Sequence, residues 1–488
     1  MKKKKIIALL LVSAMTVGLM AGCGKAEEDK SDGGNGGEVV RLKIHNMIPE
    51  QADQKEVMEK VNEYTREKIG VEVDYVFHGG SYADKIQVII ASGEEYDACF
   101  TSNWLNPFNT NVAKGAFLDI KDMLPEVAPK LYETLPEAFW EAATVKGGIY
   151  AVPNQQIAAR QMVGEMPKEY ADAAGVTADD IHNLVDCKDY AQYALDKFGA
   201  KVGGVAFAQA AEYSGYEYIS DYAAAGVIKM GDDSAKVVNY YDTDEWRELI
   251  KESIALNEAG LLDGQCAYDA EYKENQRIAK KVSINFGGTY KPGGEIEATQ
   301  RNGWEAVNAR INVEPLMSTN SIIATMYAVS ATSKHPEETL KYLELVNTDP
   351  YLMNLLSYGI EGKHYEKVSD NVIAPIPDSG YSHGQSWALG NVFNTYVLEG
   401  MPDDVWEQTA ELNDSAKRSV LLGFSFDPEP VKMQIANVSN VVKEFSSLVG
   451  GELPVEKNDE FVEKLKVAGV DEVIAEMQKQ VDEFMASK

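Results

Sequence analysis

The sequence predicts an α/β protein with two or three domains. Its 488 residues exceed what a single hydrophobic core supports. In the first part of the chain, patterns typical of strands alternate with patterns typical of helices, which predicts a parallel sheet. A second region with strand and helix patterns begins after the segment 149–154. We therefore expect two α/β regions, each with its own core.

The first α/β region is predicted from five consecutive segments. Val39–His45 and Val71–Phe77 are expected to be strands, because apolar and polar residues alternate in the first and β-branched and aromatic residues dominate the second. Helices are expected at Gln51–Gly70 and Tyr82–Ser92, where apolar residues recur at helical spacing. A third, short strand is expected at Tyr96–Phe100. Strands joined by helices in this order pair in parallel with right-handed crossovers.

Loops beyond the carboxyl ends of parallel strands are where such sheets bind ligands. In this sequence those loops are expected at 45–47, 78–81 and 101–104. The rest of the chain is predicted to carry helices at 167–174, 189–198, 243–259 (with Thr243 as N-cap), 268–281 and 336–347. Strands are expected at 282–286, 311–316 and 324–330. From Val405 the chain is expected to be largely helical, ending in an amphipathic helix at 471–484.

The N-terminus indicates export and a lipid anchor. Lys2–Lys5 form a basic segment, and the uncharged run Ile6–Ala21 that follows is short for a membrane-spanning helix. The ending Leu19-Met20-Ala21-Gly22-Cys23 looks like a bacterial lipobox, with Met20 at the place that Leu usually holds. We expect cleavage of a signal peptide at 1–22, lipidation of Cys23 and a flexible tether at 23–38. The alternative is an ordinary secretory peptide with an unrelated cysteine.

Composition excludes several classes of partner and protein. The chain has 46 Lys and Arg against 77 Asp and Glu, a formal charge of -31, so it lacks the basic surplus that nucleic-acid binding needs. A second long apolar run is absent from the sequence, which excludes a polytopic membrane protein. Cys99, Cys187 and Cys266 are too widely spaced for a disulfide framework or a zinc site, and Cys99 is expected to be a buried thiol.

Catalytic motifs are missing from the sequence. It contains no G-x-S-x-G, H-E-x-x-H or P-loop motif, and its six histidines are scattered without metal-ligand spacing. We expect no cofactor, and no motif demands a metal, although so acidic a surface could hold Ca²⁺. Counting carboxylates does not exclude an acid/base pair for glycoside cleavage, although an Asp or Glu is usually a solvated surface charge.

Aromatic and amide side chains on predicted loops point to carbohydrate binding. Trp104 follows Asn103 beyond a strand end, and Tyr290 follows Gly287–Gly288 beyond another. Gln155 follows a Pro-Asn turn, and Trp387 lies in a polar stretch. A flat ring suits the C–H face of a pyranose, while amides donate to and accept from its hydroxyls. The other tryptophans fall in helical patterns and are assigned to packing: Trp140, Trp246 and Trp406.

The order of several motifs resembles the family 1 extracellular solute-binding lipoproteins of bacterial ABC importers, carbohydrate type. The motifs are SGEEYD at 92–97, KGAFLDI at 114–120 and GGIYAVP at 147–153. The C-terminal part is similar to the branch with a C-terminal domain of unknown function, at 390–394, 423–428, 430–431 and 476–480.

This resemblance implies a two-lobed fold of the type II periplasmic-binding-protein kind, joined by several hinge crossings, with the ligand in the interlobe cleft. The expected divisions are 39–150 for the first part of lobe 1, 151–310 for lobe 2, 311–358 for the return to lobe 1, and 359–488 for a C-terminal region packed mainly on lobe 2. The resemblance places the stacking rings at Trp104 and Tyr290. Further ligand contacts, expected from loop position, are Asn46, Gln54, Asn103, Gln155 and Trp387.

The implied function is capture of a carbohydrate, expected to be an oligosaccharide, and its delivery to an ABC permease. The protein is then not an enzyme, and is expected to be a monomer anchored through Cys23 at the extracellular face of the bacterial cytoplasmic membrane. One alternative is the same architecture binding a peptide or another polar solute, which would need charge pairing for the peptide termini. Others are a surface glycoside hydrolase, with two carboxylates about 5 to 10 Å apart, and a structural adhesin.

Overall fold

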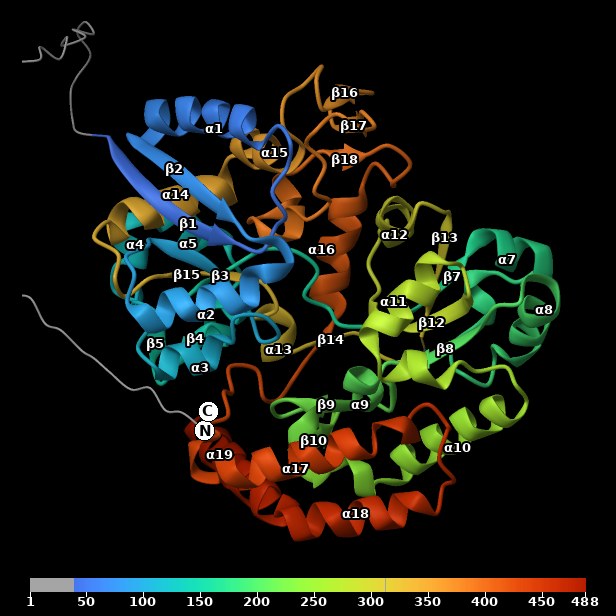
Figure 1. Ribbon diagram of the computed structural model, residues 1–488. Helices are drawn as coiled ribbons and strands as arrows, with labels where there is room; N and C mark the ends of the chain where they lie inside the picture. Colours follow the sequence, from blue (N-terminus) through green and yellow to red (C-terminus); the bar gives the residue numbers. More distant parts are fainter. Residues whose placement is uncertain (1–38, 312) are drawn as a thin grey trace, which may run out of the picture. The chain divides into compact units, whose positions relative to one another are not determined.

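Two sheets organise the chain, and each has its own hydrophobic core (Figure 1). The structure, a computed structural model, describes residues 39–311 and 313–488. The first core takes its buried residues from 42–159 and 317–422, and the second takes them from 162–311 and 421–481. The chain thus leaves the first core between Ala159 and Met162 and returns to it between Ile311 and Met317. These two cores confirm the two-lobed α/β fold.

The first sheet has the strand order β2-β1-β3-β15-β6. Its strands are β1 (Val40–Asn46), β2 (Val71–Phe77), β3 (Ala98–Thr101), β15 (Met326–Val329) and β6 (Val152–Pro153). β1 pairs in parallel with β2 and β3, as the sequence predicts, whereas β15 runs antiparallel to both β3 and β6. The crossovers are α1 (Gln54–Ile69) and α2 (Tyr82–Ser92).

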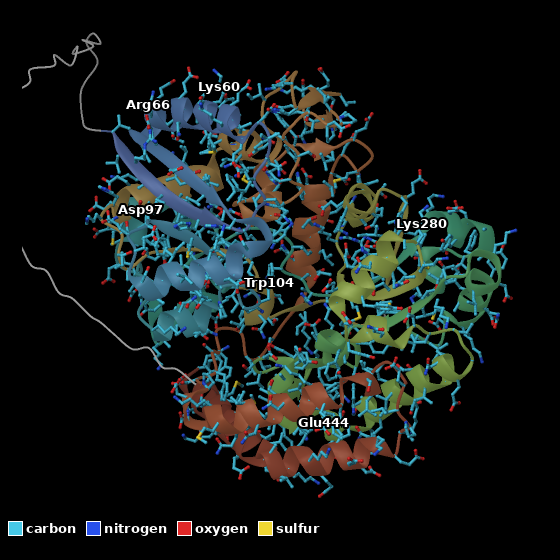
Figure 2. The ribbon with its side chains drawn as sticks, in the orientation of Figure 1. Lys60, Arg66, Asp97, Trp104, Lys280 and Glu444 are labelled. Carbon is cyan, nitrogen blue, oxygen red and sulfur yellow. The ribbon has the colours of Figure 1, made fainter. Side chains whose placement is uncertain are left out.

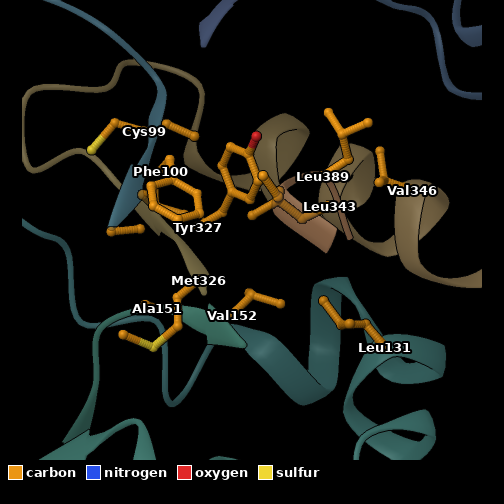
Figure 3. Close-up of a cluster of buried hydrophobic side chains, with 14 of the residues drawn as sticks. Cys99, Phe100, Leu131, Ala151, Val152, Met326, Tyr327, Leu343, Val346 and Leu389 are labelled. Carbon is orange, nitrogen blue, oxygen red and sulfur yellow. The ribbon is translucent and has the colours of Figure 1, made fainter. Parts of the chain in front are cut away.

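The first core forms because alternate side chains of β1 face inward. Leu42 and Ile44 have no exposed surface and belong to the first core. Phe100 of β3 and Tyr327 of β15 lie in the same core (Figure 3). Helices complete this lobe: α3 (Phe108–Ala113), α4 (Leu124–Val127), α5 (Pro129–Thr134), α6 (Glu137–Ala142), α14 (Pro336–Thr348) and α15 (Pro350–Tyr358). The buried ends of β1 and β3 are thereby held in fixed positions.

The second sheet has the order β13-β7-β12-β8. Its strands are β7 (Met162–Pro167), β8 (Lys201–Val205), β12 (Val282–Thr289) and β13 (Ala306–Arg310). β12 runs parallel to β8, and β7 is antiparallel to its neighbours β12 and β13. The accompanying helices are α7 (Lys168–Ala174), α8 (Lys188–Phe198), α10 (Asp244–Glu258), α11 (Ala270–Ile278) and α12 (Gly294–Asn302).

The C-terminal region divides between the two lobes. Its helices are α16 (Val405–Ser415), α17 (Lys432–Glu444), α18 (Lys457–Ala468) and α19 (Val470–Ser487). Val438, Phe461 and Met477 of the last three helices belong to the second core, beside a small sheet of β9 (Tyr216–Tyr218), β10 (Gly226–Lys229) and β11 (Val238–Asn239). Tyr381 and Leu389, in contrast, belong to the first core. The region from 359 onward therefore does not pack on lobe 2 alone.

A third, small cluster lies in the middle of this region. It consists of Tyr365, Ile373, Val397, Leu398, Met401 and Val405. Three short strands contribute to it: β16 (Tyr365–Lys367), β17 (Val372–Pro375) and β18 (Val397–Leu398). Ile296 of α12 packs against this cluster, so lobe 2 also contacts the segment that follows the return to lobe 1.

Three chain segments cross between the lobes and are bonded to one another. Arg160 and Leu316 exchange main-chain hydrogen bonds of 2.7 and 2.9 Å. β14 (Leu316–Met317) then pairs in parallel with β19 (Lys417–Arg418). The Asn413 side chain accepts from the main-chain N–H groups of residues 158 and 159 at 2.7 and 2.9 Å. These three bonded segments are the several hinge crossings that the resemblance implies.

The strand expected at 311–316 is wrong. The strand of this region is β13, which ends at Arg310, and only Leu316 belongs to a later strand, β14. The apolar pattern of the segment has another cause: Ile311 is buried in the second core and Met317 in the first, because the chain crosses between them here. The helix expected from 268 begins at Ala270 instead, where the Asp269 side chain accepts from the Tyr272 N–H at 3.0 Å.

Candidate functional site

One edge of the first sheet collects the loops in which ligand contacts are expected. Thr101 at the end of β3 pairs with Met326 at the start of β15, and Met326 also pairs with Pro153 at the end of β6. The segments 101–104, 320–326 and 153–156 therefore meet at this edge. Because β1 and β2 run parallel to β3, their carboxyl ends lie at the same edge.

One edge of the second sheet is joined directly to this first edge. Thr289 at the end of β12 pairs with Met162 at the start of β7, and Arg310 at the end of β13 pairs with the next residue, Val163. Tyr290 and Arg310 consequently lie at the edge where β7 begins. The crossing segment 154–161 links Pro153 of the first edge to Met162 of the second, so the two edges together form the candidate site.

Trp104 presents an exposed ring at the first edge. Its side chain is 54% exposed, and Figure 2 labels it near the end of the first sheet. The indole N–H donates to the carbonyl of Ala324 at 2.8 Å, which fixes the ring on the neighbouring segment. The rings of Phe100 and Trp387 lie behind it, at centroid distances of 6.2 and 6.4 Å. An exposed ring that is anchored on a buried one is suited to stacking against a flat apolar surface.

Amide side chains hold this aromatic group in place. The exposed Asn103 donates to the main-chain carbonyl of Asn320 at 3.2 Å. Asn154 donates to the carbonyl of Trp387 at 3.0 Å, and Gln156 donates to the hydroxyl of Thr325 at 2.8 Å. The crossing segment is thus bonded to the segment of Trp387 and to the segment 320–326, which also accepts the indole N–H of Trp104. Sequence reasoning did not single out Asn154, although it directly precedes the predicted contact Gln155.

Asn46 is not available as a ligand contact in this structure. Its side chain has no exposed surface, because it points to the same side of β1 as the core residue Ile44. The amide oxygen accepts from the Ile48 N–H at 2.7 Å, and the amide nitrogen donates to the hydroxyl of Tyr327. Loop position alone did not reveal that the last residue of a strand can belong to the core. We leave Asn46 out of the proposed contacts.

The remaining expected contacts lie in the same part of the first lobe. Gln54 is the first residue of α1, and its side chain accepts from the Gln51 N–H at 3.2 Å. Gln155 is half-buried, and its carbonyl accepts from the Val392 N–H at 3.0 Å. Trp387 is half-buried and packs against the first core. The roles of these residues, and of Trp104, Asn103 and Tyr290, remain predictions.

Tyr290 and Arg310 form a stacked pair at the second edge. The Arg310 guanidinium lies 4.2 Å from the centroid of the Tyr290 ring, a cation–π contact. The Tyr290 N–H donates to the carbonyl of Gln161 at 2.6 Å, which attaches the ring to the crossing segment. Gly288 just before it has φ 83°, and its N–H donates to the Gln209 side chain at 3.0 Å. No motif pointed to Arg310, because its contact depends on the pairing of β13 with β7.

Two histidines stand at the carboxyl ends of β1 and β2. His45 Nδ1 and His78 Nε2 are 2.9 Å apart, and the rings are stacked at 5.1 Å. Burial, together with the charge of the neighbouring His78, lowers the pKa of His45 to about 4, and burial also lowers the pKa of His78. Both rings are therefore neutral at pH 7, so this pair adds no charge to the first edge.

Several predictions about packing are confirmed. Trp140 and Trp246 are buried, and the Trp246 indole donates to Asn458 at 2.7 Å. Trp406 donates to the carbonyl of Thr395 at 2.9 Å and packs against the third cluster. Cys99 is buried and unpaired, as are the two other described cysteines.

The predictions about the N-terminus concern residues that the structure does not describe. The signal peptide, the lipidated Cys23 and the tether fall in residues 1–38. Across residues 39–311 and 313–488, no helix is long and apolar enough to span a bilayer. The same ranges hold no group of three or more metal-ligating side chains.

Comparison with protein families places most of the chain. A family model described as bacterial extracellular solute-binding protein matches residues 49–352. A second model, described as a domain of unknown function (DUF3502), matches residues 420–486. The first match includes the motifs at 92–97, 114–120 and 147–153, and the second includes the motif at 423–428, which confirms the resemblance stated from the sequence.

Individual relatives extend over the whole chain. A protein of Streptococcus pneumoniae serotype 4 named "Carbohydrate ABC transporter substrate-binding protein" is 28% identical over 502 residues, covering 100% of this chain and 99% of that protein. The crystal structure of the N-glycan transport solute binding protein NgtS from Streptococcus pneumoniae has a TM-score of 0.82 at 25% identity, covering 92% of this chain and 99% of that chain. NgtS in complex with Man5GlcNAc has a TM-score of 0.74 at 26% identity, with coverage of 92% and 99%.

Proposed function

Because the chain belongs to the bacterial extracellular solute-binding proteins, we propose that it captures an oligosaccharide between its two sheet edges and delivers it to an ABC importer. The names of the relatives support both parts of this proposal. The 28% identical relative is named as a carbohydrate ABC transporter substrate-binding protein, and the NgtS complex contains the oligosaccharide Man5GlcNAc. The proposed function is binding without chemical change of the ligand.

The observation that carries the carbohydrate proposal is the exposed, anchored ring of Trp104. Its indole N–H is already bonded to Ala324, so the ring does not need to reorganise when a sugar stacks on it. Asn103 beside it is exposed and can exchange hydrogen bonds with hydroxyls. Tyr290 offers a second ring from the other edge. A sugar between them would have an apolar face covered and its hydroxyls paired, as carbohydrate recognition requires.

Hinge motion is the proposed way in which the two edges meet the ligand. The lobes are connected by short, mutually bonded crossing segments, of which 154–161 joins the two edges. Rotation about such segments brings two lobes together without breaking either core. Trp104 and Tyr290 belong to different lobes, so ligand contacts from both edges would favour the closed arrangement.

The test is titration calorimetry of the mature protein against two panels. One panel holds oligosaccharides, including Man5GlcNAc, acidic glycans and their neutral counterparts, and the other holds short peptides of matched size. Heat of binding with at least one oligosaccharide and unchanged ligand on recovery are expected. Binding of peptides without binding of any glycan would contradict the carbohydrate proposal, and glycan cleavage during the incubation would contradict the non-catalytic one.

We also propose that the protein is a monomer held at the extracellular face of the cytoplasmic membrane by a lipid on Cys23. The lipobox-like ending at 19–23 and the Gly-rich stretch at 24–38 support this. Replacing the acylated residue in Cys23→Ser removes the anchor, so the protein is expected to move from the membrane fraction into the culture medium. Retention of the Cys23→Ser protein in the membrane fraction would contradict lipidation at this residue.

A further inference from the structure

Arg310 differs from most arginines of this chain in what it pairs with. The arginines that form ion pairs with carboxylates within 4.0 Å are Arg41, Arg66, Arg160, Arg247, Arg277 and Arg301. Among the described residues, Arg310 has no such partner, although the chain as a whole carries a charge of -31. Its guanidinium instead lies over the Tyr290 ring at the candidate site. In so acidic a protein, an unpaired cation at this place calls for an explanation.

Some charges near Arg310 are paired or absent, whereas Glu314 on the return segment and Arg418 of β19 have no ion-pair partner among the described residues. Arg160 on the crossing segment pairs with Glu212 at 3.1 Å. The histidine pair of the first edge is neutral at pH 7, because burial lowers the pKa of both rings. His182 approaches only the main-chain carbonyl of Arg310, at 3.4 Å. Within the part of the chain that the structure describes, the Arg310 guanidinium therefore has no carboxylate within ion-pair distance.

The guanidinium of Arg310 also keeps its hydrogen-bonding capacity. Its guanidinium carbon lies 4.2 Å from the centroid of the Tyr290 ring, and its side chain donates no hydrogen bond to another described residue. The N–H fork is thus free to bind a carboxylate with two parallel hydrogen bonds. Contact with the ring restricts the guanidinium, which lowers the conformational entropy that binding would cost.

Closure of the lobes makes the charge of the ligand important. Arg310 is exposed in this structure, and closure of the two edges over it would remove it from water, where a cation without a counter-charge is costly. A neutral sugar could donate and accept hydrogen bonds there but could not compensate the charge. A carboxylate on the sugar would compensate it and would favour the closed arrangement.

We propose that Arg310 makes the site selective for oligosaccharides that carry a carboxylate, such as those containing uronic or sialic acid. The carboxylate binds the guanidinium fork, and the sugar ring next to it contacts the aromatic ring of Tyr290. This inference rests on the proposed carbohydrate function and names the ligand class of the same site.

The experiment compares ligands that differ in charge and hardly in size. Trigalacturonate is compared with its methyl ester, and 3′-sialyllactose with the methyl ester of its sialic acid carboxylate, by calorimetry on the complete mature protein. At least one acidic member is expected to bind roughly 10-fold or more tightly than its neutral counterpart, the size of one good charge-assisted contact. Arg310→Gln should remove this preference, and Arg310→Lys should retain only part of it, because an ammonium lacks the planar fork. Arg247→Gln, which removes the same charge on α10, is the matched control and should leave the preference intact.

Failure of this inference can be distinguished from failure of the proposed function. Binding of neutral glycans alone, equal binding of both members of each pair, or an acidic preference that survives Arg310→Gln would overturn the role of Arg310 while the carbohydrate function stands. Absence of binding to every glycan would refute the carbohydrate function itself. If Arg310→Gln does not fold, the comparison of acid with ester on the unchanged protein still decides whether the site prefers a carboxylate.

Discussion

Individual tryptophans of this protein have opposite environments that suit opposite roles. Trp246 has no exposed surface, and its indole N–H donates a hydrogen bond to Asn458 inside the second core. The indole N–H of Trp104 also donates to a protein group, the carbonyl of Ala324, but 54% of the Trp104 side chain is exposed to solvent. A solvated ring contributes little to the free energy of folding, because most of its apolar area is not removed from water. The exposed area of Trp104 therefore remains available for a ligand.

Replacement of this ring tests its role directly. Trp104→Ala is expected to weaken oligosaccharide binding by roughly 10- to 100-fold, as for truncation of a central aromatic contact. The temperature of unfolding should change little, because the ring is largely exposed. Tyr351→Ala is a matched control, since Tyr351 is 57% exposed on α15 and lies outside both edges. Calorimetry and thermal unfolding of both variants give the two quantities, and unchanged affinity in Trp104→Ala would remove Trp104 from the site.

At the scale of elements, the short helix α13 (Thr319–Ile322) connects the candidate site to both lobes. The carbonyl of Asn320 accepts from the Asn103 side chain, and the Asn320 side chain donates to the carbonyl of Tyr218 in β9 at 3.3 Å. The hydroxyl of Thr319 donates to the carbonyl of Leu421 at 3.1 Å. A displacement of the Asn103 loop by a ligand would therefore be transmitted through α13 to the crossing segments.

The cap of this helix allows its role to be tested. In the capping box of α13, Ser318 accepts from the Ser321 N–H at 3.2 Å, so Ser318→Ala should lower the free energy of unfolding by about 1 kcal/mol. Because α13 holds the Asn103 loop, ligand affinity should fall as well. The N-cap Thr243 of α10 likewise accepts from an N–H group, that of Trp246 at 3.2 Å, and lies outside the segments of both edges, so Thr243→Ala should cost similar stability without loss of affinity. Chemical denaturation and calorimetry separate the two effects, and equal affinities in both variants would contradict the positioning role.

At the scale of the whole molecule, two buried titratable groups give opposite pH dependences. Burial raises the pKa of Glu217 in β9 to about 7, although the hydroxyl of Ser419 on a crossing segment donates to it. Between about pH 4.5 and 7 the folded state keeps this proton while the unfolded state releases it, so the free energy of unfolding falls as pH rises. His45 stays neutral in the folded state down to about pH 4, so its contribution falls as pH drops below 6.5.

Removing the ionisable group of Glu217 should leave the pH dependence of stability that comes from His45. Glu217→Gln keeps a hydrogen-bonding group for Ser419 but cannot ionise, so it should be more stable than the parent protein at pH 7.5 and nearly equal to it at pH 4. The expected gain is at most roughly 3 kcal/mol, from the linkage between pKa and stability. Denaturant unfolding of both proteins across this pH range measures it. A stability difference that does not vary with pH would show that Glu217 is ionised equally in the folded and unfolded states.

Local patterns predicted β1, β2, β3 and β15 of the first sheet and several helices, but only β12 of the second sheet, because β7, β8 and β13 were not expected. The bounds of β2 and α2 agree with those expected. Gly70 ends α1 directly before β2, and Gly93 ends α2, so a glycine in the sequence marks each of these boundaries. The cap at Thr243 was also predictable from the local sequence. The burial of Asn46 and the contact of Arg310 with Tyr290 were not predictable, because each depends on a strand far away in the sequence. This strand is β15 for Asn46 and β7 for Arg310. The exposure of Trp104 agrees with its expected loop position.

The insertion of β15 between β3 and β6 has a consequence for biosynthesis. Residues 98–101 and 152–153 have left the ribosome long before residues 326–329 are translated, so the strand that separates β3 from β6 arrives last. Until then the nascent first sheet keeps open edges, which are prone to wrong pairing. β15 begins about 225 residues after the end of β3, so the first sheet is completed only late in synthesis of the chain.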